Sequence, residues 1–253
     1  MTEYTFLFLL LLAHVIGDFT LQSSKIVESK NRYGKGYLYH ILIVFFSCTA
    51  FTLFFFFSFK WIYAILIIII THSLIDYLKI KINRSKKLSG IGDSIALLSD
   101  QFLHLLFILL AFYLFRPWIP NPVYIKILNK FVNHTQIINH LPDKFIFLSA
   151  CYLFLTRGGT VFVKTFSGRY RHEIALKSEK NKMNGIIIGE IERIVLFTLF
   201  VLQIYIWAAI VIVLKIAWQY YFCKPEERDF KGTLYSTGLA LIVGAIYNTI
   251  FIW

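Results

Sequence analysis

Three pairs of histidine and aspartate stand four residues apart along the chain. They are His14 with Asp18, His72 with Asp76, and Asp100 with His104. Four residues is just over one helical turn, so the two side chains of each pair leave the same face of a helix. Seven histidines and six aspartates in 253 residues would give about 0.3 such pairs by chance. All three pairs lie in apolar runs, where ionisable side chains are rare and usually functional.

Metal binding is the chemistry that these residue types favour. A carboxylate at membrane depth costs several kcal/mol unless it is paired, protonated or bound to a cation. Imidazole together with carboxylate suits zinc, manganese or iron better than calcium or magnesium. The predicted ligands are His14, Asp18, His40, His72, Asp76, Asp100 and His104. Seven ligands exceed one tetrahedral site, so we expect one or two divalent ions, or carboxylates that orient the histidines.

The composition indicates the class of protein that must position these residues. The chain is 58% hydrophobic and 18% aromatic, with 16% charged residues, which is typical of a polytopic helical membrane protein. The net charge of +12 is not arranged as a basic stripe with interleaved aromatics, so nucleic acid is not an expected partner. We interpret the basic residues as determinants of membrane topology.

Apolar runs of about 20 residues, the length that spans a bilayer, predict an all-α bundle of transmembrane helices. We expect about eight spans, with seven as the alternative, near residues 4–21, 40–59, 61–79, 95–115, 145–163, 186–203, 205–222 and 233–252. The stretch 186–222 is too long for one span, so we divide it at a tight hairpin near Gln203–Tyr205.

Lysine and arginine are distributed unevenly over the predicted loops. Alternate loops carry eighteen of them and the opposite loops carry five, which predicts that both termini lie outside. In this orientation the three pairs and His40 all fall in the cytoplasmic halves of the first four helices. We therefore predict one shared layer, in an N-terminal half at 1–115. An outer loop at 116–144, with a possible interfacial helix, then leads to a C-terminal half at 145–253.

The C-terminal half carries its own charged residues. Glu192 and Lys215 are expected to pair across the hairpin. Structural ion pairing is one interpretation of these residues. The other is that Arg193 and Lys215 bind the anionic group of a substrate, in a substrate site that also includes Glu192.

These motifs resemble a bacterial membrane family of unknown function, DUF3307. The resemblance rests on Leu-Ala-His14-x-x-Gly17-Asp18-Phe-x-Leu-Gln22, His40, His72-x-x-x-Asp76-x-x-Lys79, Asp100-Gln101-x-x-His104, Gly189-x-x-Glu192-Arg193, Lys215 and Gly232-Thr233-x-x-Ser236. The chain departs from its relatives at Gln219 and Arg228. The resemblance implies a multi-pass protein of the bacterial inner membrane and no particular activity.

Our leading hypothesis is a metal-dependent hydrolase whose site faces the cytoplasm. Asp76 and Asp100 would serve as bases, and Lys79 would either take part or extend its ammonium group to the interface. An amphiphilic or lipid-linked substrate would arrive from the membrane lipids of the inner leaflet. Transport of divalent cations or protons through the same residues is the alternative. A membrane scaffold or sensor without enzymatic activity is the third hypothesis.

Overall fold

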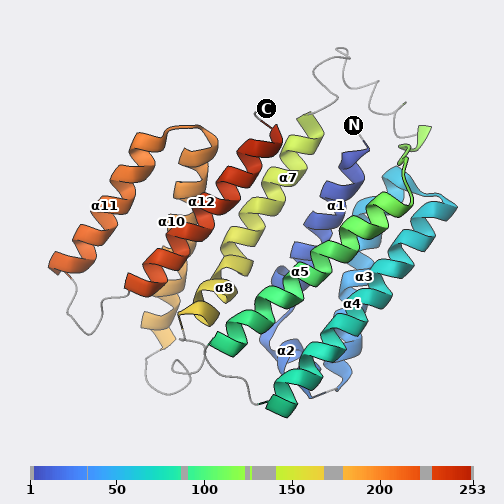
Figure 1. Ribbon diagram of the computed structural model, residues 1–253, viewed down its shortest axis with the longest axis horizontal. Coiled ribbons are helices and arrows are strands. Elements are labelled where there is room, and N and C mark those ends of the chain that lie inside the picture. The colour runs from blue at the N-terminus through green and yellow to red at the C-terminus, as the bar shows by residue number, and fades with distance from the viewer. Residues whose placement is uncertain are drawn as a thin grey trace. The chain divides into compact units, whose positions relative to one another are not determined.

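The described part of the computed structural model consists mainly of helices (Figure 1). It describes residues 3–32, 34–86, 91–122, 126, 141–167, 179–222 and 230–251. No strand occurs within these ranges, which confirms the all-α fold class. Most of the possible interfacial helix within 116–144 lies outside the described residues.

The chain divides into two compact units. Unit 1 comprises residues 1–88 and 95–150. Its elements are α1 (Tyr4–Val15), the π-helix η1 (Ile16–Thr20), α2 (Ser24–Asn31), α3 (Lys35–Phe56), α4 (Phe59–Lys86), most of α5 (Ile91–Leu114) and the first part of α7 (Leu141–Leu153). The short helix α2 packs beside the start of α3 (Figure 1).

Unit 2 comprises residues 89–94 and 151–253. It contains the end of α7, the π-helix η2 (Phe154–Gly158), α8 (Gly159–Phe166), α10 (Glu179–Val201), α11 (Tyr205–Phe222) and α12 (Phe230–Phe251). Helix α10 packs against both α11 and α12. The predicted hairpin is confirmed, because α10 ends at Val201, α11 begins at Tyr205, and Gln203 between them adopts a left-handed φ of 61°.

Within the described residues, six helices are long and apolar enough to cross a membrane. A seventh candidate is the pair formed by Tyr4–Thr20 and Ser24–Asn31, which is bent by 86°. Each of the eight predicted apolar stretches is helical over most of its described length. Helix α10 is not among the candidate spans, and it carries Glu190, Glu192 and Arg193. The count of eight spans and the outward position of both termini therefore stay predictions.

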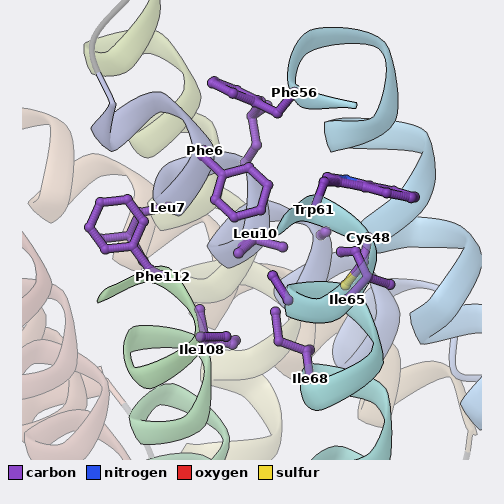
Figure 2. Packing of buried hydrophobic residues seen from close by; sticks show 14 of the residues in the cluster. Phe6, Leu7, Leu10, Cys48, Phe56, Trp61, Ile65, Ile68, Ile108 and Phe112 are labelled. Carbon is purple, nitrogen blue, oxygen red and sulfur yellow. The ribbon is translucent and has the colours of Figure 1, made fainter. Parts of the chain in front are cut away.

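The apolar core of unit 1 lies between α1, α3, α4 and α5. Figure 2 shows Phe6, Leu10 and Ile65 facing one another in this core. The ring of Phe6 also stacks on Trp118 with 3.7 Å between centroids. Lipid tails are as apolar as these side chains, so close packing rather than removal from water holds such helices together. This rigid core fixes the helices that carry the histidines and aspartates.

Candidate metal centre

Asp18 lies in a widened turn of the first helix. His14 occupies the last turn of α1, and Asp18 follows in η1, where the Leu21 amide donates to the Ile16 carbonyl five residues back at 2.9 Å. Such π-turns occur frequently at functional sites. Beside Asp18, a Cβ on Gly17 would stand 3.3 Å from Val44, so the glycine brings η1 close to α3.

Three histidines from three helices surround the Asp18 carboxylate. One of its oxygens, Oδ1, lies 3.4 Å from His72 Nε2 and 3.6 Å from His40 Nε2. The other oxygen, Oδ2, lies 3.9 Å from His14 Nδ1. The side chain of Asp18 is 8% exposed, and the three histidines are buried. These are contacts at the distance of loosely paired groups, longer than a good charge-assisted hydrogen bond.

Asp76 shares two of these histidines. Its Oδ2 lies 3.1 Å from His40 Nε2 and 3.5 Å from His72 Nε2. The two Nε2 atoms are themselves 3.0 Å apart, so one ring must present a proton and the other a lone pair at this contact. The carboxylates of Asp18 and Asp76 are thus connected through the same pair of imidazoles.

Asp100, on α5, also belongs to this cluster. Its Oδ2 accepts hydrogen bonds from Lys79 Nζ at 2.7 Å and Gln101 Nε2 at 3.0 Å, and its Oδ1 lies 3.5 Å from His104 Nε2. The His104 ring stacks on His72 with 4.1 Å between centroids. All seven predicted ligands therefore belong to one cluster, which we call the His/Asp cluster.

Lys30 is a member of the site that we did not predict. Its Nζ lies 2.7 Å from Asp76 Oδ2, and its side chain is only 11% exposed. Lys30 lies between the predicted spans 4–21 and 40–59, and charge counting treats every lysine between spans alike. The available signal was local: Ser23 caps a helix in which Ile26 and Lys30 are four residues apart and share a face.

The approach of Lys30 depends on tight packing of α2 against α3. A Cβ on Gly36 would stand 2.6 Å from the Ile26 carbonyl oxygen and 2.8 Å from the Lys30 amide nitrogen. Gly36 also donates its backbone N–H to Ser29 Oγ at 2.9 Å. Only glycine permits this close approach. The contact holds α2 where Lys30 reaches Asp76.

The cluster contains three groupings that could hold a metal ion. They are His14, Asp18 and His72; His40, His72 and Asp76; and Asp76, Asp100 and His104, with the ligand atoms of each group within 4.8 Å of one another. Near the first group is a cavity of about 10 Å³, the lower limit of the space that one water needs. His14 Nε2 and His104 Nε2, from two residues that line it, are buried and make no hydrogen bond. Buried nitrogens without partners fit a donor set for a single small cation.

The charged residues predicted in the second half lie in unit 2. Lys215 donates to Glu192 between α11 and α10, which confirms the predicted pair. Arg193 Nε donates to the Leu155 carbonyl of η2 at 2.5 Å, and its Nη2 donates to Thr160 Oγ1 at 2.8 Å. A π-turn frees carbonyls from the helical ladder, and the arginine satisfies one of them. A role of Arg193, Lys215 and Glu192 in substrate binding stays a prediction.

Comparison with known proteins identifies one family. The sequence model of the family described as "Protein of unknown function (DUF3307)" matches residues 6–132. The matched range includes every member of the His/Asp cluster, together with Lys30 and Lys79. No curated protein and no solved structure matches the chain.

Proposed function

We propose, for a chain that belongs to the DUF3307 family, a metal-dependent membrane enzyme of the hydrolase type. Its site would be the His/Asp cluster, opening toward the cytoplasm from a bacterial inner membrane. The metal would be zinc, manganese or iron, because the donors are imidazole nitrogens and carboxylate oxygens.

The charge balance of the cluster carries this proposal. Asp76 and Asp100 each have an ammonium group at 2.7 Å, from Lys30 and Lys79 respectively. Asp18 has no lysine or arginine partner within the described residues, and only histidines surround it. With neutral histidines the group of three carboxylates and two ammoniums has a net charge of −1. Burial of an uncompensated charge is costly, so a cation at Asp18 is favoured.

The same balance favours one ion over two. One divalent ion changes the net charge from −1 to +1. A second ion at Asp76 or Asp100 would compete with Lys30 or Lys79 for carboxylate oxygens. We therefore assign the ion to Asp18, His14 and His72, the group that has no direct lysine contact.

The remaining groups could then perform hydrolysis. A bound divalent ion would supply an activated water and polarise a carbonyl or phosphoryl oxygen. Asp100 Oδ1 makes no hydrogen bond, so it can accept a proton, while Lys79 holds the other oxygen and orients the carboxylate. The Lys79 side chain is 29% exposed, so an anionic group of an amphiphilic or lipid-linked substrate would meet it first.

Elemental analysis of the full-length protein in detergent tests the metal. We expect about one equivalent per chain after incubation with zinc, manganese or iron, lost in Asp18→Asn. Asp93→Asn, half-buried in α5 outside the cluster, is the matched control and should keep the ion. Wild-type protein that is monodisperse and helical but holds no ion would refute the metal site.

Activity is tested separately from metal content. Amphiphilic p-nitrophenyl esters and phosphates are suitable probes, and Asp100→Asn should lose turnover while it retains the ion. Metal without turnover of any such probe would leave a metal-binding protein and remove the hydrolase part of the proposal.

Proton or cation transport is the second candidate, and one observation favours it. Contacts run without interruption from Lys79 through Asp100, His104 and His72 to Asp18. The cavity beyond His14 is walled mainly by apolar residues, among them Val44, Cys48, Ile68 and Ile108, and this counts against a continuous polar path. Proton flux into proteoliposomes that His72→Ala abolishes would reverse the ranking, and its absence would leave the enzyme.

A further inference from the structure

Unit 1 has an apolar groove along one flank of α3, and none of the His/Asp cluster residues line it. Its volume is about 570 Å³. The residues that line it include Ile16, Leu21, Ile26, Tyr39, Phe46, Ala50 and Phe51. These residues come from η1, α3, α2 and the segment between η1 and α2, so the groove begins where α2 turns away from the first helix.

The groove is separate from the metal centre. His40, Val44 and Cys48 are buried on the inner face of α3. Two of the residues that line the groove, Tyr39 and Phe46, are 53% and 62% exposed. Exposed apolar side chains on a membrane-spanning helix face lipid tails, and here they are gathered in a concave surface that an acyl chain can occupy. The groove is thus independent of the proposed enzymatic function.

One end of the groove is basic. Lys35 is exposed and precedes Tyr39 by one helical turn, so both lie on the same face of α3. Lys25 is exposed beside Ile26 on α2. No ion pair of Lys25 or Lys35 is found within the described part of the chain. Arg32, in contrast, pairs with Glu28 at 2.7 Å. Two lysines without an ion-pair partner in the described residues therefore lie at the end of the groove that is next to α2.

The dimensions match one lipid chain. From Tyr39 to Phe51 the helix rises about 18 Å, at about 1.5 Å per residue. Half of a hydrocarbon core of about 30 Å is about 15 Å, so the groove spans roughly one leaflet. The 86° bend before α2 lets that helix lie along the membrane interface at the level of the head groups.

We propose that this groove binds an acyl chain of an anionic phospholipid, whose head group lies between Lys25 and Lys35. Charge complementarity distinguishes this occupant from a second copy of the chain. In a symmetric dimer across this groove, the lysines of both copies would gather without an acidic partner, because Arg32 already occupies Glu28. A zwitterionic lipid also offers a phosphate, but its own ammonium group cancels that charge, so it would attract the two lysines less strongly than an anionic lipid does.

Native mass spectrometry of the full chain, titrated with phosphatidylglycerol and with phosphatidylcholine, tests the proposal. We expect one saturable phosphatidylglycerol per chain with a clear preference over phosphatidylcholine. Replacement of either lysine, Lys25→Gln or Lys35→Gln, should reduce that preference about fivefold, as expected for one basic residue at an anionic surface. Lys60→Gln, an exposed lysine at the start of α4, should leave it unchanged.

The groove itself is tested by filling it. Ala50 is exposed in the groove, so Ala50→Phe should abolish saturable binding while melting temperature and metal content stay those of wild type. Ala209→Phe, at an exposed alanine of α11, is the matched control and should bind normally. Equal binding of both lipids, or binding that Ala50→Phe leaves intact, would overturn the proposal. A dimer that Ala50→Phe dissociates, without a change in bound lipid, would also overturn it.

Discussion

Two ion pairs on the same short helix make a sharp test of how burial changes the value of a charge. Lys30 and Arg32, both at the end of α2, each lie 2.7 Å from a carboxylate oxygen. The Lys30 and Asp76 side chains are 11% and 2% exposed, whereas those of Arg32 and Glu28 are 75% and 67% exposed. Lys30→Met and Arg32→Met remove the same charge at the same distance.

The expected magnitudes differ severalfold. Removal of one partner of a buried pair leaves an uncompensated charge and costs about 3–5 kcal/mol. His40, whose Nε2 is 3.1 Å from the same Asp76 oxygen, can compensate part of that charge and favours the lower end. An exposed pair contributes about 0–1 kcal/mol. For a protein of this size, the melting temperature should fall by about 6–20 °C in Lys30→Met and by at most about 4 °C in Arg32→Met.

Thermal melts in one detergent, by circular dichroism at fixed pH and salt, measure the difference. The double variant Lys30→Met with Asp76→Asn should recover much of the loss, because both charges are then absent. A divalent metal should also protect Lys30→Met more than wild type, since the freed Asp76 oxygen can coordinate it. Equal, small losses in Lys30→Met and Arg32→Met would refute the view that Lys30 compensates a buried carboxylate.

Three further predictions concern packing and buried hydrogen bonds. Gly36→Ala should destabilise unit 1 by about 1–3 kcal/mol, because its Cβ would stand under 3 Å from backbone atoms. Gly17→Ala should be milder in the same melt, because its nearest contact would be a Val44 methyl at 3.3 Å, with the Val44 Cα at 3.5 Å. Arg193→Met should cost about 1–3 kcal/mol by leaving buried acceptors such as the Leu155 carbonyl unpaired, measured by melting in detergent, and a neutral result would contradict this role. Leu10→Ala in the core of unit 1 should cost about 2–5 kcal/mol, and a loss below 1 kcal/mol would show that the core collapses around it.

Helical spacing singled out six of the seven members of the His/Asp cluster, and the predicted orientation of the helices added His40. Each His–Asp pair recurs at four residues within an apolar helix, so its face is determined locally, and an apolar helix leaves polar groups no partners except one another. The hairpin at Gln203 followed from the length of the apolar stretch 186–222, and the pair of Glu192 with Lys215 followed from the hairpin. These features depend on interactions within one helix or between neighbours in the chain.

Lys30 could not be assigned in this way. Its role arises from the 86° bend before α2 and from the contact of α2 with Gly36, both of which depend on tertiary packing. Charge counting correctly treats most basic residues between spans as solvated, and it has no means to identify the one that turns inward. The partners of Arg193 were missed for a similar reason, because the π-turn in η2 that frees the Leu155 carbonyl leaves no pattern in residue type.

The widened turn at η1 sets the rotational phase of everything that follows it in the first helix. A π-turn accommodates one residue more than an α-turn, and one residue corresponds to about 100° of rotation about the helix axis. Removal of a single residue from Ile16–Thr20 would let the segment relax into a regular α-helix, and the residues after the deletion would change faces together. Leu21 and α2 would then leave the first helix in another direction, and Lys30 would no longer be delivered to Asp76. The additional residue of this turn thus links the direction of α2 to the ion pair that compensates a buried carboxylate on α4.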